Sequence, residues 1–298
     1  MQLPLKLSTV AAAAVAILVY AGSATRAAPP EVEIHDDLQY GVGGGEKLLL
    51  DLARPTKLDK PTPCIVFIHG GGWAAGNRKA HYNHMRQAAE DGFIAATISY
   101  RLVKDGKHRW PAQIEDGKCA IRWLRANAER FSIDPERIGA IGYSAGAHLS
   151  MLLGTLDKDD DLEGDGGSPD QSSKVQAVVA YFGPTNLTVE YPPSSRNIVA
   201  NFIGGPLDEQ RADYDRASPL RYVSPGDATM LLFHGTKDEL VPYEQAFEMA
   251  TALTKAGVPG RVEILLGHRH GWGGDTAEHT ERRSMEFFRS TLKLDAAP

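Results

Sequence analysis

The sequence predicts an α/β fold, in which a mostly parallel central sheet is covered by helices on both faces. Two observations support this prediction. Short, continuously apolar runs at residues 65–68 and 230–233 are typical of strands buried on both sides. These runs alternate with segments of helical periodicity, and 298 residues with 42% hydrophobic content suffice for one large core. We therefore expect a single α/β domain at residues 29–298.

Residues 1–28 differ in kind from the rest of the chain. Lys6 precedes an apolar run at residues 10–20, and small residues follow at 21–28. This pattern is typical of a secretory signal peptide, with cleavage near Ser23 or Ala27, because the apolar run is short for a membrane-spanning helix. No cysteine follows it, which argues against a lipoprotein anchor; an uncleaved membrane tether is the alternative. The sequence thus predicts an exported protein, periplasmic or secreted, with no stable membrane anchor once the leader is removed.

The charge of the chain limits its partners. Loss of residues 1–28 removes two of the 32 basic residues and none of the 38 acidic ones, which lowers the net charge from −6 to −8. Nucleic acid and strongly acidic polymers would be repelled by such a surface, whereas a small neutral molecule or a neutral polymer would not. The sequence leaves the oligomeric state undetermined.

The pentapeptide Gly142-Tyr143-Ser144-Ala145-Gly146 has the G-x-S-x-G spacing of a nucleophile elbow. It follows an apolar run at residues 137–141 that predicts a buried strand. Glycines at both ends permit the sharp turn from strand to helix that exposes the serine hydroxyl. The competing interpretation of the pentapeptide alone is a glycine-rich turn with a solvated serine.

Three further segments favour the catalytic interpretation. The strand at residues 65–68 runs into His69-Gly70-Gly71-Gly72-Trp73, a loop type whose backbone N–H groups stabilise an oxyanion. The strand at residues 230–233 leads to a loop that carries Asp238. A last predicted strand at residues 262–266 precedes a loop that carries His270. The order serine, acid, histidine is the one that the α/β-hydrolase architecture requires.

With these motifs the chain resembles the esterase and lipase branch of the α/β-hydrolases, and most closely the BD-FAE-like group of bacterial acetylxylan and feruloyl esterases. The resemblance extends over nearly the whole mature chain. It covers the leading hairpin at residues 40–55, the loops at 69–73 and 99–102, the segment 122–127, the elbow with His148, and the stretches 183–185 and 218–219, ending with the Asp238 and His270 loops.

A serine is a poor nucleophile unless a base accepts its proton and a carboxylate orients that base. Ser144, His270 and Asp238 fit these three roles. The resemblance further implies that the N–H groups of Gly71, Gly72 and Ala145 form the oxyanion hole. Such a mechanism requires no metal and no organic cofactor.

Neighbouring residues compete for some of these roles. His268 lies in the same loop as His270 and is the alternative base, although a histidine followed by glycine and an aromatic residue is the family pattern. Glu239 adjoins Asp238 and should point away from it. His69 and His148 are expected to be structural, and Asp116 is expected to make hydrogen bonds in the first turn of a helix.

Metal sites and a disulfide are disfavoured by the pattern of residues. His81 and His84 are spaced i, i+3 on a probable helix, with no third ligand nearby. The acidic run at 157–166 has Glu163 where an EF-hand loop needs glycine, so a solvated loop is favoured over a calcium site. Cys64 and Cys119 are expected to be small buried side chains, with a disulfide as the alternative.

The substrate pocket is less defined by the sequence. Trp73, Tyr143 and Trp272 adjoin the catalytic loops and are predicted to line it, with core packing as the alternative for Trp272. Residues 186–222 are too few for a full cap domain and predict a small flap over the site.

The predicted function is hydrolysis of short acyl or feruloyl esters, with acylated plant polysaccharide as the substrate suggested by the resemblance. Two other activities stay open. Kynurenine formamidases have a similar H-G-G-x-W loop, which raises amide-bond hydrolysis, and a lipase would prefer longer acyl chains. A non-catalytic binding module on the same fold is the alternative outside enzymes, and the presence of all three triad residue types argues against it.

Overall fold

The computed structural model describes residues 29–294, so the predicted signal peptide at 1–28 lies outside the described residues. The strands are β1 (Val32–Gly43), β2 (Glu46–Pro55), β3 (Thr62–Ile68), β4 (Ile94–Ile98), β5 (Ile133–Tyr143), β6 (Ala177–Tyr181), β7 (Thr229–Gly235) and β8 (Gly260–Leu265). The α-helices are α1 (Tyr82–Glu90), α2 (Ala112–Ala126), α3 (Ala128–Phe131), α4 (Ala145–Thr155), α5 (Pro193–Ile203), α6 (Arg211–Arg216), α7 (Glu244–Ala256) and α8 (Asp275–Thr291). Three short 3₁₀ helices are η1 (Arg78–His81), η2 (Lys158–Asp160) and η3 (Pro219–Tyr222).

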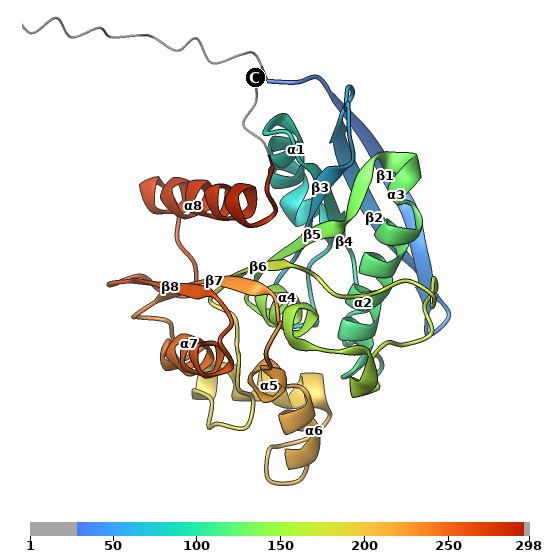
Figure 1. Ribbon diagram of the computed structural model, residues 1–298. Helices are drawn as coiled ribbons and strands as arrows, with labels where there is room; N and C mark the ends of the chain where they lie inside the picture. The colour runs from blue at the N-terminus through green and yellow to red at the C-terminus, as the bar shows by residue number, and fades with distance from the viewer. Residues whose placement is uncertain (1–28, 295–298) are drawn as a thin grey trace, which may run out of the picture.

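The sheet has the order β1-β2-β4-β3-β5-β6-β7-β8 (Figure 1). The first two strands form an antiparallel hairpin, β2 pairs antiparallel with β4, and every later pairing is parallel. The predicted mostly parallel sheet is therefore confirmed. Strand β3, which the sequence marks as continuously apolar, is buried along its whole length.

Helices cover both faces of this sheet. One core layer joins the sheet to α2, α4 and α7 through residues such as Ile121, Leu149 and Met249. The other joins it to α1 and α8 through residues such as Met85 and Phe288. Figure 1 shows α1 and α8 on the opposite side of the sheet from α4 and α7. Within residues 29–294, no helix combines the length and apolar character needed to cross a membrane.

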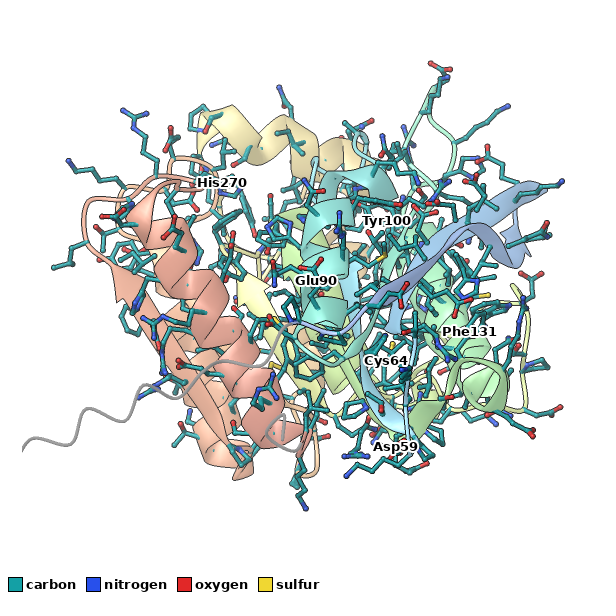
Figure 2. All side chains as sticks on the ribbon, turned by 90° about the horizontal axis from the view of Figure 1, so that it is seen from above. Asp59, Cys64, Glu90, Tyr100, Phe131 and His270 are labelled. Atoms are coloured by element: carbon teal, nitrogen blue, oxygen red, sulfur yellow. The ribbon has the colours of Figure 1, made fainter. Side chains whose placement is uncertain are left out.

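The register of the parallel strands collects the predicted catalytic loops at one edge. Ile68 of β3 pairs with Gly142 of β5, and Tyr143 pairs with Tyr181 of β6. Because parallel strands end together, the residues that follow β3, β5, β7 and β8 meet at this carboxyl edge. In Figure 2, His270 and Tyr100 lie at one end of the molecule and Asp59, which precedes β3, lies at the other.

Residues 186–222 form a compact flap of α5, α6 and η3 rather than a cap domain, as predicted. The flap is fastened to the catalytic edge by hydrogen bonds. Ser194 Oγ donates to the carbonyl of Glu239 over 2.5 Å, and Ser195 Oγ donates to the carbonyl of Leu240 over 2.6 Å. The first turn of α5 is therefore attached directly to the loop that carries Asp238.

Three details differ from or refine the sequence analysis. The last strand, β8, ends at Leu265, and Leu266 lies in the turn that follows and is 82% exposed. Asp116 binds the backbone N–H and guanidinium of Arg101 rather than amides of its own helix, which corrects the expected first-turn hydrogen bonds. Cys64 and Cys119 are both buried and free.

Candidate active site

The nucleophile elbow is formed where β5 passes into α4. Ser144 has φ 53° and ψ −118°, a strained conformation for a residue with a side chain. The turn leaves no space for side chains on either flank. A Cβ at Gly142 would lie 2.1 Å from the carbonyl oxygen of Gly146, and one at Gly146 would lie 2.1 Å from that of Ile68. Both glycines are therefore required by packing as well as by the turn.

Ser144, His270 and Asp238 lie in one hydrogen-bonded chain. Ser144 Oγ is 2.9 Å from His270 Nε2, and His270 Nδ1 is 2.8 Å from Asp238 Oδ2. The Asp238 side chain is fully buried, whereas that of His270 is 14% exposed. The imidazole thus joins a buried carboxylate to a hydroxyl at the protein surface, which is the arrangement of a serine nucleophile with its base.

Four donors surround the Asp238 carboxylate. Oδ1 accepts hydrogen bonds from the backbone N–H groups of Leu240 and Val241, each over 2.9 Å. Oδ2 accepts from His270 and from His234, whose Nε2 is 3.1 Å away. Burial alone would raise the pKa of this carboxyl, but these hydrogen bonds outweigh burial and hold the pKa well below its ordinary value. Asp238 is therefore ionised at every pH at which the enzyme would work.

His268, the alternative base, lies elsewhere. Its ring is edge-on to Trp272, with 6.0 Å between the ring centroids, and it lines an open cavity of about 280 Å³ with Asp275 and His279. Glu239 pairs with Arg269 over 2.8 Å and points away from the triad position, as expected. The geometry brings His270, and not His268, to Ser144.

The glycine loop after β3 lies directly against the elbow. A Cβ at Gly70 would be 2.7 Å from the carbonyl oxygen of Tyr143 and 3.4 Å from Ser144 Cβ. Gly71 and Gly72 have φ of 111° and 58°, which side chains rarely adopt. Ala145 is the first residue of α4, where backbone N–H groups have no acceptor within the helix. These amides are thus available to a negatively charged oxygen beside Ser144.

The three aromatic residues predicted to line the pocket are engaged with the protein. Trp73 is 3% exposed and stacks on Phe202, with 4.1 Å between the rings. Tyr143 is stacked between His81 and Tyr181, at 4.5 and 4.6 Å, on the α1 and α8 side of the sheet. The packing of these rings therefore supports structural roles rather than an aromatic substrate wall.

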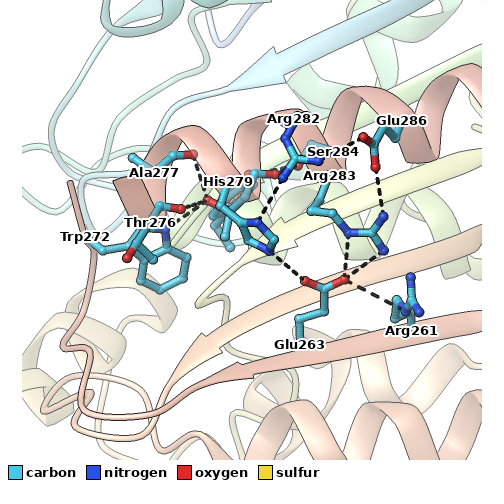
Figure 3. A network of polar contacts seen from close by, with 12 residues as sticks. Arg261, Glu263, Trp272, Thr276, Ala277, His279, Arg282, Arg283, Ser284 and Glu286 are labelled. Atoms are coloured by element: carbon cyan, nitrogen blue, oxygen red, sulfur yellow. Dashed lines mark hydrogen bonds and ion pairs between the residues drawn. The ribbon is translucent and has the colours of Figure 1, made fainter. Parts of the chain in front are cut away.

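Trp272 anchors the His270 loop to α8. Its indole Nε1–H donates to Thr280 Oγ1 over 3.0 Å. Figure 3 shows Trp272 beside a polar network in which Glu263 of β8 meets Arg283 and His279 of α8. Such partly exposed ion pairs contribute little stability, but together with the indole they set the position of the loop relative to the helix.

Two histidines behind the site have structural partners, as expected. His69 stacks on Tyr100, with 4.2 Å between the rings. His148 accepts a hydrogen bond from Trp73 Nε1 over 3.3 Å and donates one to the carbonyl of Ala217 over 2.6 Å. It thereby connects the nucleophile helix to the glycine loop and the flap.

Two other groups of possible ligands are occupied by protein contacts. His84 pairs with Glu281 of α8 over 3.3 Å, and Glu163 of the acidic loop binds Lys118 and Arg122. In the part of the chain that the structure describes, no cluster of three or more histidine, cysteine or acidic side chains is arranged to hold a metal ion.

His148 predicts a stability that falls in acid. Its burial lowers the pKa of the folded imidazole from 6.5 to about 4. Between these values the unfolded chain binds a proton that the folded chain does not, so this contribution to stability is complete above pH 6.5 and lost as the pH falls toward 4. At pH 5 the loss from this one group is about 2 kcal/mol.

The measurement is urea unfolding at pH 7.5 and pH 5. His148→Gln, whose amide can accept from Trp73 and donate to Ala217 without titrating, should lose less stability between the two pH values than the wild type. The exposed His279→Gln serves as the control and should behave like the wild type. Equal losses in the His148 variant and the wild type would contradict this assignment.

Comparison with known proteins agrees with this geometry. A family model described as BD-FAE matches residues 50–253. The chain belongs to the BD-FAE family. Esterase LipC of Mycobacterium tuberculosis is 33% identical to this BD-FAE member over 235 residues, which cover 75% of this chain and 57% of LipC. The chain thus spans a little over half the length of the curated relatives it matches.

Two solved structures resemble the BD-FAE member over most of their length. A truncated carbohydrate esterase from gut microbiota is 26% identical, with a TM-score of 0.78, and the match covers 90% of this chain and 99% of that one. Esterase 2 of Thermogutta terrifontis with bound propionate is 25% identical, with a TM-score of 0.74 and coverage of 91% and 97%. The α/β-hydrolase fold predicted from the sequence is confirmed.

Sequence reasoning missed two features of the site. His234 is the second-last residue of β7 and lies four residues before Asp238, but nothing in that spacing distinguishes a carboxylate donor from a packed histidine. Ile198 of α5 lies over the glycine loop, where a Cβ on Gly72 would be 2.7 Å from Ile198 Cγ2. The sequence around Ile198 does not indicate this position, because the approach of Ile198 to Gly72 depends on how the flap folds.

Proposed function

We propose that this protein is a serine carboxylic ester hydrolase that acts through an acyl-enzyme on Ser144. The observation that carries the proposal is the continuous chain of hydrogen bonds from Ser144 through His270 to Asp238. The relatives' names, esterase LipC among them, support the same reaction class.

In the first half of the reaction, Ser144 Oγ attacks the ester carbonyl carbon while its proton passes to His270 Nε2. The fixed charge of Asp238 stabilises the imidazolium that results. The carbonyl oxygen becomes an oxyanion, which the N–H groups of Gly71, Gly72 and Ala145 stabilise, and each such donor contributes about 3 to 4 kcal/mol. The N-terminus of α4 adds a favourable dipole.

The tetrahedral intermediate then collapses and its carbon–oxygen bond to the alcohol breaks, which completes the formation of the acyl-enzyme. The His270 imidazolium gives its proton to the departing alkoxide. Water then attacks the acyl-serine and transfers a proton to His270, and the acid leaves as Ser144 recovers its proton. Protein groups and water carry every proton in this scheme.

We further propose that the acyl group is short, acetyl foremost. The flap is small, and Ile198 of α5 occupies space over Gly72 that a long acyl chain would need. The bound propionate of the Thermogutta esterase supports a short acyl group, and the likeness to a carbohydrate esterase supports a neutral polysaccharide as the carrier. Export through the signal peptide pattern at residues 1–28 would place the enzyme where such polymers occur.

The test is kcat/KM of the mature protein across acetyl, butyryl, octanoyl and palmitoyl nitrophenyl esters, with acetylated xylan, methyl ferulate and N-formylkynurenine alongside. We expect a maximum at acetyl or butyryl. Ile198→Ala should then raise the octanoyl to acetyl ratio, by roughly fourfold for each additional methylene that becomes buried. Phe247→Ala, which removes an exposed apolar side chain on α7, is the matched control and should leave the ratio unchanged.

Two other outcomes of this test would indicate a lipase or an amide hydrolase instead. A maximum at octanoyl or longer in the wild type, with activation at an oil–water interface, would make the protein a lipase. Preference for N-formylkynurenine over every ester would make it an amide hydrolase of the formamidase type.

A further inference from the structure

A second imidazole touches the carboxylate of the triad. His234 Nε2 lies 3.1 Å from Asp238 Oδ2 and 3.0 Å from the carbonyl oxygen of Val241. Both neighbours are acceptors, so this nitrogen carries a proton and its N–H is shared between them. The His234 side chain is 2% exposed and Asp238 is fully buried, so water does not compete for this contact.

The contact places two imidazoles on one oxygen. Oδ2 of Asp238 accepts from His270 and from His234, whereas Oδ1 accepts only backbone N–H groups. A carboxylate oxygen that receives a second hydrogen bond shares its negative charge between two donors. The electrostatic attraction between Asp238 and a protonated His270 is therefore weaker than it would be if His270 were the only imidazole bound to Oδ2.

We propose that His234 is a positioning residue of the triad: it holds Oδ2 of Asp238 in place and takes up part of its charge, so that the carboxylate is shared between two imidazoles. This inference rests on the proposed function. The shared N–H also fastens Asp238 to Val241, which closes the turn that presents the carboxylate. The hydrogen bonds of His234 go to Asp238 and Val241, and not to Ser144.

Other charged groups face away from this pair of contacts. Arg269 and Glu239, on the two loops that carry the triad, pair with each other over 2.8 Å and are 76% and 48% exposed. Lys237 is exposed, and Arg196 of α5 pairs with Glu190. From the α8 side, His268 contacts the ring of Trp272. Among the described residues, the side-chain donors to Asp238 are therefore His234 and His270.

The experiment compares the pH dependence of kcat/KM for a short nitrophenyl ester in the wild type, His234→Leu and His234→Gln. In His234→Leu, His270 should hold its proton more tightly, and the midpoint of the acidic limb should rise by about one pH unit. The plateau value of kcat should fall about tenfold, because loss of the hydrogen bond from residue 234 to Asp238 affects the chemical step. KM should change by less than twofold. His234→Gln supplies an N–H at the same reach and should restore both values.

Leu232→Ala on β7 is the matched control for damage to the strand, because this buried side chain packs in the core layer with α4 and α7 and offers no hydrogen bond to Asp238. It should lower thermal stability and leave the midpoint unchanged. If His234→Leu does not fold, the comparison of His234→Gln with His234→Asn, whose shorter amide falls short of Oδ2, carries the test. The proposal would be overturned if the midpoint of the acidic limb were the same in the wild type and in the variant without an N–H donor to Oδ2 at position 234.

A second measurement separates this inference from the proposed function. The proton between His270 Nδ1 and Asp238 Oδ2 should give a low-field proton resonance, which should move downfield when His234 no longer shares the carboxylate. This shift is expected even if the wild type hydrolyses no ester, in which case the proposed function fails alone. An active wild type whose resonance is unchanged in His234→Leu would contradict the inference alone.

Discussion

Replacement of Ser144 by alanine should lower kcat for a short acyl ester by on the order of 10⁶-fold. The variant retains the amides of Gly71, Gly72 and Ala145, so the residual rate should be the one that substrate binding and oxyanion stabilisation supply alone. The fold should persist, because Ser144 Oγ has its contact with His270 rather than with the core.

Labelling with a fluorophosphonate probe tests directly whether Ser144 is the nucleophile. The wild type should form one covalent adduct, located on Ser144 by peptide mass spectrometry, and the alanine variant should form none. Ser150→Ala is a matched control, since this buried serine on α4 donates to the carbonyl of Gly146 and lies outside the site. Full activity in Ser144→Ala would exclude the proposed mechanism.

The second large effect separates two histidines that lie two residues apart. His270→Ala should reduce kcat by on the order of 10⁴-fold or more, because it removes the base between Ser144 and Asp238. His268→Ala should cost less than tenfold, because its ring packs against Trp272 and has no contact with the triad. The comparison uses kcat at saturating ester, with the melting temperature of each variant as a check on folding. A larger loss in His268→Ala would move the base to that residue.

Much of the site was predictable because its signals are local. The elbow depends on Gly142 and Gly146, whose spacing is visible in five consecutive residues. Both must be glycine, because a Cβ at either position would lie 2.1 Å from a backbone carbonyl oxygen. Likewise, buried parallel strands appear as short apolar runs, so residues that follow such runs could be assigned to one edge of the sheet. The positions of Ser144, of Asp238 and of the loop that carries His268 and His270 follow from these two facts.

Side-chain orientation was not predictable in the same way. Tyr143 is next to the nucleophile in sequence, yet consecutive residues of a strand point to opposite faces, and its ring packs against His81 on the α1 and α8 side. Trp73 adjoins the glycine loop, but a positive φ turns it inward onto Phe202, which lies more than a hundred residues later. Proximity along the chain was therefore misleading for both aromatic residues.

The sequence by itself determined the α/β fold class, the elbow and the three residue types of the triad, because each is encoded by spacing within a few residues. Only the tertiary structure decided between His268 and His270, placed His234 on Asp238 Oδ2, and set Ile198 of the flap over Gly72. These contacts join segments whose approach depends on how strands and helices pack. No local pattern records such distances, since they are set by the core that forms when the whole chain folds.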